Sequence, residues 1–264
     1  MDSIFITGLW DIKRNTLINK YSNDWKREFK FYTDKLEELL QTGLNIIVYG
    51  DLEIKYIVDK YKNSFFIHYP KELFYNLSFF KDIQEIRTSE KWYDQQDAKW
   101  LKYSPQAALE LYIPIMITKM YLIKKTKEIY PEYNYIYWID AGITRTHDVK
   151  LLKDISPKLE KYDKFIFLSH YYIDNNEIHG FRREGVHRYC NKNFVDRIMK
   201  GFFFGGKINN LDEIIEEYNK IIKDSLEEKY LGIEETYNTI LINKKPEFFN
   251  EVIIPSCINI TNSL

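Results

Sequence analysis

The chain has 264 residues, of which 45% are hydrophobic and 29% are charged, a composition typical of one large globular domain rather than a disordered protein. Its formal net charge of −1 argues against a broad surface for nucleic acid, so we expect no nucleic-acid partner. The closest candidate for a membrane span, Leu109 to Ile123, contains an acid, a proline and a lysine, so we expect no membrane span.

The cysteine content and the first residues indicate the compartment. Cys190 and Cys257 are the two cysteines, and although they could form a disulfide, such low usage is more typical of a reducing compartment. The start of the chain, Met1-Asp2-Ser3, lacks the basic residues that open a secretory signal peptide. We therefore predict a soluble, cytoplasmic protein.

Strands and helices alternate in the first third of the chain. Strands are predicted at short apolar runs, and helices where apolar residues recur at helical spacing. This alternation predicts a parallel sheet with right-handed crossovers. The predicted elements are a strand at Ser3 to Gly8, a helix at Asn23 to Thr42, a strand at Leu44 to Tyr49, a helix at Glu53 to Tyr61 and a strand at Ser64 to Tyr69.

The next stretch is helical. Glu72 to Asp97 is helix-prone without clear bounds, and Ser104-Pro105 then supplies an N-cap and a proline at the first helical position. The helix that follows is predicted over Gln106 to Ile129, with a kink at Pro114. Lys119 lies in its second half, where a lysine usually extends to solvent.

A strand rich in aromatic and β-branched residues runs from Tyr133 to Ile139 and ends at a carboxylate, Asp140. The two residues that follow, Ala141 and Gly142, are too small to shield this charge. Unpaired buried carboxylates are costly, and ligands of open α/β sheets bind beyond the carboxyl ends of the strands, so we expect chemistry at Asp140. The alternative is that Asp140 only caps the next turn.

The second half of the chain contains two further candidate features. Gly205 and Gly206 follow an aromatic strand and would let the backbone approach a ligand closely, or would form a simple turn. Glu234 and Glu235 begin a helix, where acids also favour the helix dipole. The predicted elements are a strand at Asp163 to His170, a long loop at Tyr171 to Arg188, a short helix at Asn193 to Lys200, a strand at Gly201 to Gly206, helices at Asn210 to Lys229 and Gly232 to Asn243, and an apolar run at Val252 to Pro255.

Several common motifs are absent from the sequence. It has no paired Cys-x-x-Cys, no His-Glu-x-x-His, no P-loop and no Gly-x-Gly-x-x-Gly, so zinc sites and dinucleotide-dependent dehydrogenases have no support. Ser169-His170 lacks the Gly-x-Ser-x-Gly frame of a hydrolase. A strand-end acid, a glycine pair and a second acidic pair remain. These groups suit a divalent cation with a diphosphate, and a carboxylate acting as base or nucleophile at a sugar carbon.

Four segments in this order resemble the GT-A glycosyltransferases, and most closely the HtrL/YibB family with the related WlaTC-type enzymes. The resemblance covers nearly the whole chain and implies a single α/β GT-A-like domain over residues 1–264, with a mostly parallel central sheet flanked by helices. It divides the domain into a nucleotide-sugar half, about 1–145, and an acceptor half, about 146–264. The segments are Phe5 to Gly8 with Trp10 to Arg14, Tyr137 to Gly142, Phe203 to Gly206, and Gly232 to Asn238.

The resemblance implies a glycosyltransferase that moves a sugar from a nucleotide-sugar donor, expected to be a UDP-sugar, to a glycan or protein acceptor. Either Glu234 or Glu235 would be the catalytic carboxylate. Residue chemistry alone suggests that the loop with His179, Arg182 and Arg183 closes over the diphosphate. The implied site residues are Thr7, Arg14, Lys119, Asp140 and Gly142 for the nucleotide sugar, Asp140 for a divalent cation, and His179, Arg182, Gly205 and Gly206 for the sugar and acceptor pocket.

One departure from the family pattern affects the metal. The usual motif is Asp-x-Asp, and here Gly142 takes the third position. We expect a divalent cation, manganese or else magnesium, with the missing ligand supplied by a histidine, Asp148, water or the diphosphate. Alternatively, arginine and lysine replace the metal.

Two other functions compete with the transferase. The glycine at the metal motif suggests a catalytically degenerate GT-A-like module that binds a glycan or a protein. A nucleotidyltransferase would need a basic, glycine-rich loop after the first strand, and Gly8 to Asp11 is neither. The donor sugar, the acceptor, the stereochemical outcome and the oligomeric state stay open.

Overall fold

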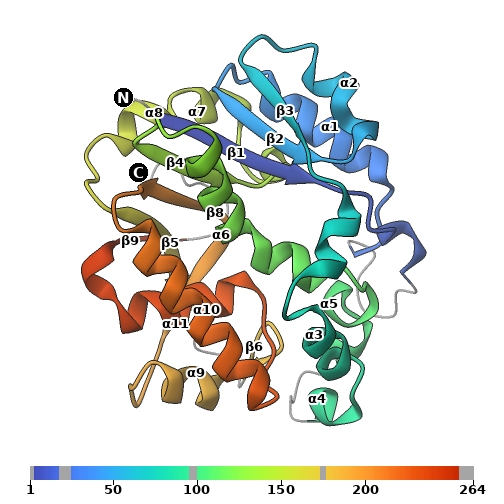
Figure 1. The fold of residues 1–264 in the computed structure, drawn as a ribbon, viewed down its shortest axis with the longest axis vertical. Helices are drawn as coiled ribbons and strands as arrows, with labels where there is room; N and C mark the ends of the chain where they lie inside the picture. Colours follow the sequence, from blue (N-terminus) through green and yellow to red (C-terminus); the bar gives the residue numbers. More distant parts are fainter. Residues whose placement is uncertain (1–2, 18–24, 95–99, 173–176, 256–264) are drawn as a thin grey trace.

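The structure is a computed structural model that describes residues 3–17, 25–94, 100–172 and 177–255, so Cys257 and the first two residues lie outside it. Within these ranges seven strands form one sheet in the order β3-β2-β1-β4-β8-β5-β9 (Figure 1). The strand β8 is antiparallel to both its neighbours, and the other pairs are parallel. The strands are β1 (Ser3–Leu9), β2 (Ile46–Gly50), β3 (Ser64–His68), β4 (Tyr135–Ile139), β5 (Phe165–Tyr171), β8 (Arg197–Lys207) and β9 (Phe249–Ile253).

Helices cover both faces of this sheet (Figure 1), which explains why β1, β2 and β4 are almost continuously apolar. One face packs against α3, α6, α9, α10 and α11, and the other against α1, α2, α7 and α8. The predicted fold class, one α/β domain with a mostly parallel central sheet flanked by helices, is confirmed. The helices are α1 (Phe29–Leu40), α2 (Lys55–Val58), α3 (Phe80–Arg87), α4 (Glu90–Asp94), α5 (Pro105–Ala108), α6 (Tyr112–Ile129), α7 (Val149–Lys153), α8 (Ile155–Leu159), α9 (Arg183–Tyr189), α10 (Leu211–Glu227) and α11 (Glu234–Lys244).

The long helix predicted over Gln106 to Ile129 is divided into α5 and α6. Ser104 caps α5 as predicted, because its side chain accepts a hydrogen bond from the backbone N–H of Ala107. Leu109 then adopts an extended conformation and ends α5. Pro114 therefore lies in the first turn of α6, where a proline fits without kinking the helix.

The segment from Tyr171 to Arg188 is not the loop predicted from its polar composition. It contains a short hairpin, formed by β6 (Glu177–Ile178) and β7 (Phe181–Arg182), followed by α9. Ile178, Phe181 and Val186 are fully buried and anchor this region against α11. A few buried apolar side chains therefore order a segment that is otherwise polar.

The short helix predicted at Asn193 to Lys200 is also wrong, because β8 begins at Arg197. Ile198 and Met199 pair with β5, and both side chains are buried in the core. The strand is 11 residues long, and it pairs with β5 between Arg197 and Gly206 and with β4 between Phe203 and Lys207. Pairing with β5 and burial of these two side chains therefore outweigh the local helical preference.

The glycine pair lies near the end of β8, where Lys207 is the last residue of the strand. Gly205 pairs with both Tyr137 and Ile166, and its φ is 136°. A Cβ added at Gly205 would lie 2.3 Å from the carbonyl oxygen of Ile136, and one at Gly206 would lie 2.6 Å from that of Lys164. The close backbone approach predicted for this pair is therefore that of adjacent strands and not that of a ligand.

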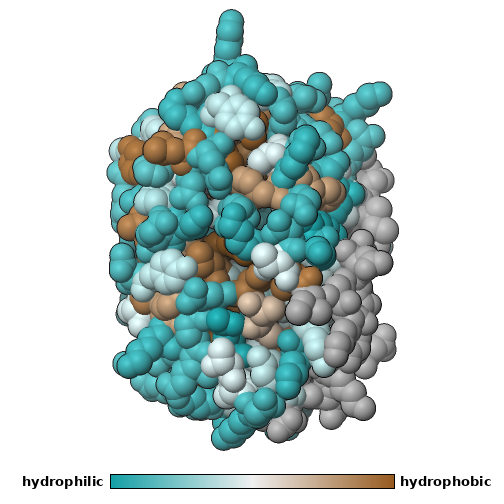
Figure 2. Space-filling model, turned by 90° about the vertical axis from the view of Figure 1, so that its right-hand side faces the viewer, coloured by the Kyte–Doolittle hydropathy of each residue, from teal (hydrophilic) through white to brown (hydrophobic). Residues whose placement is uncertain are grey.

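Hydrophilic residues cover most of the face seen in Figure 2, and hydrophobic residues are visible in its hollowed middle. None of the helices within the described ranges combines the length and the hydropathy needed to cross a bilayer.

We predict that Gly205→Ala lowers the free energy of unfolding by about 3 kcal/mol or more, because the alanine adds backbone strain and a clash in the middle of the sheet. Gly43→Ala is the matched control, since Gly43 also has a positive φ, 78°, but has open space around it. Gly43→Ala should lower the free energy of unfolding by about 1 kcal/mol. Urea unfolding of both variants tests this, and equal losses would contradict the strand-packing role.

Candidate functional site

A cleft of about 610 Å³ lies at the carboxyl ends of β1 and β4. The chain runs outward from β1 to β3 and then returns to the other side of β1 as β4, so the strand order reverses between β1 and β4. Ligands of open α/β sheets bind at such a switch point. Residues 8–12 from the end of β1 and residues 140–143 after β4 line the cleft, so the structure brings Asp140 to the edge where the sequence predicted chemistry.

The lining of the cleft is mainly aromatic and cationic. Three arginines and two lysines contribute to it, and most of its rings come from the segment before α1, from α1 and α6, and from the ends of β1 and β4. A cleft of this kind suits a ligand that has both a flat ring and negative charge. The charged residues are Asp11, Arg14, Arg27, Lys119, Asp140, Arg145, Lys200 and Glu235, and the rings are Trp10, Trp25, Phe29, Phe31, Tyr32, Tyr112, Trp138 and Phe202.

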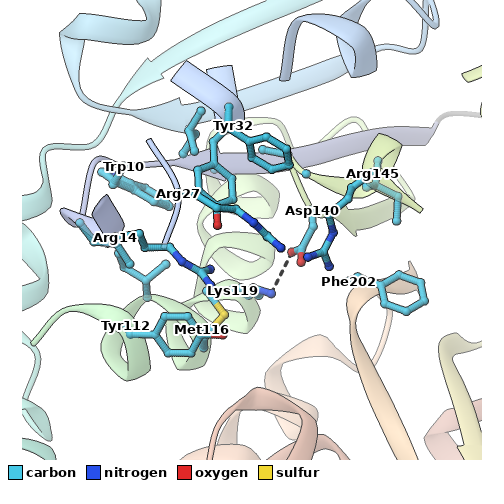
Figure 3. Close-up of a pocket in the computed structure, with 18 of the residues that line it drawn as sticks. Trp10, Arg14, Arg27, Tyr32, Tyr112, Met116, Lys119, Asp140, Arg145 and Phe202 are labelled. Carbon is cyan, nitrogen blue, oxygen red and sulfur yellow. Dashed lines mark hydrogen bonds and ion pairs between the residues drawn. The ribbon is translucent and has the colours of Figure 1, made fainter. Parts of the chain in front are cut away.

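Lys119 is the centre of a charge cluster, and Figure 3 shows its ion pair with Asp140. Its side chain is 2% exposed, so it does not extend to solvent as lysines in such helices usually do. The Nζ atom donates to Asp140 Oδ1 at 2.8 Å, to Glu234 Oε1 at 2.6 Å and to the carbonyl oxygen of Gly201 at 3.0 Å. One ammonium therefore joins α6, β4, β8 and α11.

The protonation of this cluster follows from its burial. Burial favours the neutral form of Lys119, yet the charges of Asp140 and Glu234 outweigh burial and raise its pKa above the ordinary 10.5, so Lys119 is a cation. Burial raises the pKa of Glu234 above its ordinary 4.5, and Lys119 opposes this only in part. The second oxygen of Glu234, Oε2, has no hydrogen-bond partner among the described residues.

Glu235 has a different environment, although it follows Glu234 directly. It lines the cleft, and its Oε2 lies 2.6 Å from His179 Nε2 and 3.6 Å from Lys200 Nζ. Its Oε1 accepts a hydrogen bond from the backbone N–H of Gly201 at 3.1 Å. Burial disfavours the charged form, but Lys200 and His179 outweigh it and hold the pKa of Glu235 well below its usual range. Glu235 is thus an anion at the wall of the cleft.

Gly201 connects the two acids. Its carbonyl accepts from Lys119, and its N–H donates to Glu235. A Cβ on Gly201 would lie 2.1 Å from Glu234 Oε1, so only glycine lets Glu234 reach the lysine.

Several of the predicted site residues line the cleft. Arg14 does so with its guanidinium over the rings of Tyr32 and Tyr112, at 5.5 and 5.9 Å from their centroids. Gly142 also lines the cleft. His179 does not line it, but its Nε2 lies 2.6 Å from Oε2 of Glu235, which does.

Other predicted site residues lie elsewhere. Thr7 is buried within β1 and does not line the cleft. Arg182 pairs with Glu184 at 3.1 Å, and Arg183 donates to the backbone oxygen of Val195. Gly205 and Gly206 face the neighbouring strands and not the cleft.

The sequence reasoning missed Arg27, Arg145 and Lys200. Arg145 lies five residues after Asp140, and this position close to the predicted strand end was a usable signal. Arg27 lies in a segment predicted as helix, but α1 begins only at Phe29, and Arg27 precedes it at the cleft. Nothing local distinguishes Lys200 from a surface lysine.

The residues near Asp140 do not fit a divalent cation. Asp140 Oδ1 already accepts from Lys119 and from Trp138 Nε1, the latter at 2.7 Å. Asp148, a candidate second ligand, caps α7 by accepting from the backbone N–H of Lys150 at 2.7 Å. The described part of the chain contains no group of three or more His, Cys, Asp or Glu side chains that could hold a metal ion. The carboxylates near the cleft are thus used in ion pairs and hydrogen bonds within the protein and do not form a set of metal ligands.

No protein-family model matches the chain, and no curated protein matches its sequence. Among solved structures, it is similar to mouse xyloside xylosyltransferase 1, with 8% identity and a TM-score of 0.45 over 94% of this chain and 84% of that one. It is also similar to 4-diphosphocytidyl-2C-methyl-D-erythritol synthase from Anaerococcus prevotii, with 10% identity and a TM-score of 0.45 over 97% and 90% of the two chains. At these TM-scores the likenesses do not indicate an activity for this chain.

We predict that Lys119→Met lowers the free energy of unfolding at pH 7 by about 3–5 kcal/mol, because it leaves Asp140 and Glu234 without their cation. Lys127→Met is the matched control on the same helix. Lys127 forms a surface pair with Asp212 at 3.3 Å, and its loss should cost no more than about 1 kcal/mol. Urea unfolding measures both, and a Lys119→Met variant as stable as the control would contradict the burial argument.

We also predict an effect of acid that depends on Glu235. Its folded-state pKa is lowered, so its contribution to stability is present above the ordinary pKa of 4.5 and is lost as the pH falls through the folded-state value. The free energy of unfolding of the wild type should therefore fall more steeply below pH 4.5 than that of Glu235→Gln. Chemical unfolding at a series of pH values measures both slopes, and parallel curves would argue against an ionised Glu235.

Proposed function

We propose that this chain is a nucleotide-sugar-dependent glycosyltransferase of the HtrL/YibB type, with a UDP-sugar as donor and a hydroxyl of a glycan or glycoprotein as acceptor. One observation carries the proposal. An ionised carboxylate, Glu235, lies at the wall of a cationic, aromatic cleft at the switch point of an α/β sheet. The cytoplasm is the proposed compartment, in line with the low cysteine content.

The cleft offers separate surfaces to the parts of a donor. Its aromatic residues, among them Trp10, Tyr32 and Tyr112, can stack on a nucleobase, and its guanidinium groups can bind phosphate oxygens. Asp140 has one oxygen held by Lys119 while its side chain is 35% exposed, so it can accept hydrogen bonds from the hydroxyls of a ribose or sugar. The proposed donor therefore extends from the aromatic rings past Asp140 toward Glu235.

The two acids of α11 have different proposed roles. Glu235 is the catalytic carboxylate, since it lines the cleft as an anion. A carboxylate with a lowered pKa is a weak base, and its negative charge instead suits attack on, or stabilisation of, the positive sugar carbon that develops during transfer. Glu234 does not line the cleft and is a positioning residue, because it holds Lys119 and thereby Asp140.

We predict that Glu235→Gln lowers kcat for sugar transfer by roughly 100-fold to 1,000-fold, with little change in the affinity for UDP, because the charge that stabilises the developing positive carbon is removed. The measurement is release of UDP from a panel of UDP-sugars, with simple glycosides as acceptors. Glu184→Gln is the control, because Glu184 is exposed and pairs only with Arg182 among the described residues. Glu234→Gln should lower the thermal midpoint as well as kcat, since it acts through Lys119.

The variants also distinguish the transferase from a binding module. Tight binding of UDP with no release from any UDP-sugar, in the wild type and in Glu235→Gln alike, would favour a degenerate GT-A-like protein that binds without turnover. Full activity of Glu235→Gln together with loss in Glu234→Gln at unchanged stability would reverse the roles of the two acids.

A further inference from the structure

Arg14, Arg27 and Arg145 line the cleft without a carboxylate partner in the described part of the chain. Arg14 Nε donates to the backbone oxygen of Trp25 at 3.2 Å, and its guanidinium lies over two rings. The guanidinium of Arg27 lies 5.0 Å from the ring centroid of Phe31. Aromatic faces attract these cations but do not neutralise their charge.

The other charged groups of the cleft already have partners. Lys119 pairs with Asp140, and Lys200 lies near Glu235. Asp11, the remaining acid of the lining, pairs with Lys13 at 2.5 Å. The lining as a whole has five cationic and three anionic side chains, an excess of two positive charges. The diphosphate of a nucleotide sugar carries two negative charges, so it matches this excess.

The arrangement of the arginines suits one anion with two phosphate groups. They come from three separate segments, after β1, before α1 and after β4. Their guanidinium ends gather around Asp140 and Lys119 (Figure 3). Each guanidinium can bind phosphate oxygens through two parallel N–H groups, so three of them can surround a diphosphate from several sides.

We propose that Arg14, Arg27 and Arg145 form a diphosphate subsite that neutralises the donor and the leaving nucleoside diphosphate without a divalent cation. The identity of the donor rests on the proposed function, whereas the anion site itself does not. During transfer the bond between the sugar carbon and the diphosphate oxygen breaks, and its electron pair stays on that oxygen. The acceptor oxygen bonds to the sugar carbon and loses its proton to solvent. The leaving group gains a negative charge, so guanidinium groups placed around it bind it more strongly as the bond breaks.

Calorimetric titration with UDP and with inorganic pyrophosphate tests the subsite, each in EDTA and again in manganese. The expected result is that both ligands bind in EDTA, and that manganese changes the affinity by less than about threefold, a shift of under 1 kcal/mol. Arg14→Gln, Arg27→Gln and Arg145→Gln should each weaken binding of both ligands by about tenfold or more. These side chains are exposed or half-buried, so the thermal midpoint should stay unchanged.

Arg188→Gln is the matched control, because Arg188 is an exposed arginine on α9 that pairs with Glu228 and does not line the cleft. It should bind UDP and pyrophosphate like the wild type. Binding of both ligands only with manganese, or equal binding by the cleft variants and the control, would overturn the subsite.

The outcomes for the subsite and for the transferase are separable. Pyrophosphate binding in EDTA that is lost in the arginine variants, with no turnover of any UDP-sugar, would keep the subsite and reject the proposed function. Sugar transfer together with binding that requires manganese would keep the transferase and reject the subsite.

Discussion

The buried ammonium of Lys119 is the interaction on which the candidate site depends. A charge that is almost fully removed from water is stable only with partners, and Lys119 takes them from the end of β4 and the start of α11. Gly201 makes this possible, because any side chain there would collide with Glu234. Since Glu235 follows Glu234 in the same helical turn, the contact that holds one acid against the lysine also directs the other toward the cleft.

Much of the fold could be predicted from local pattern. The alternation of strands and helices up to β3 depends on hydrophobic periodicity, and periodicity is a property of the sequence alone. The place of Asp140 followed from the same reasoning, because a strand that is apolar on both faces must end near the edge where ligands of α/β sheets bind. The alternative, that Asp140 only caps a turn, does not account for its bonds to Lys119 and Trp138.

The rest depends on contacts between distant segments. The hairpin and helix after β5 are ordered by Phe181 and Val186, which are buried against α11. Because the residues around them are mostly polar, the local sequence does not predict this burial. A glycine within a strand indicates that another segment approaches its backbone closely. For Gly205, only the strand order shows that the approaching backbone belongs to β4. The adjacent acids of α11 look equivalent in the sequence and differ through partners from other elements, which are Lys119 for Glu234, and Lys200 and His179 for Glu235.

The same lysine also determines how the cleft can bind a phosphate. A divalent cation bound to the other oxygen of Asp140 would repel the Lys119 ammonium held at Oδ1, and two cations would then share one carboxylate. Three guanidinium groups meanwhile line the same cleft, and none of them forms an ion pair with a carboxylate of the described chain. Neutralising a diphosphate with arginines leaves the buried network intact, whereas neutralising it with a metal at Asp140 would disturb the interaction that holds β4, α6 and α11 together.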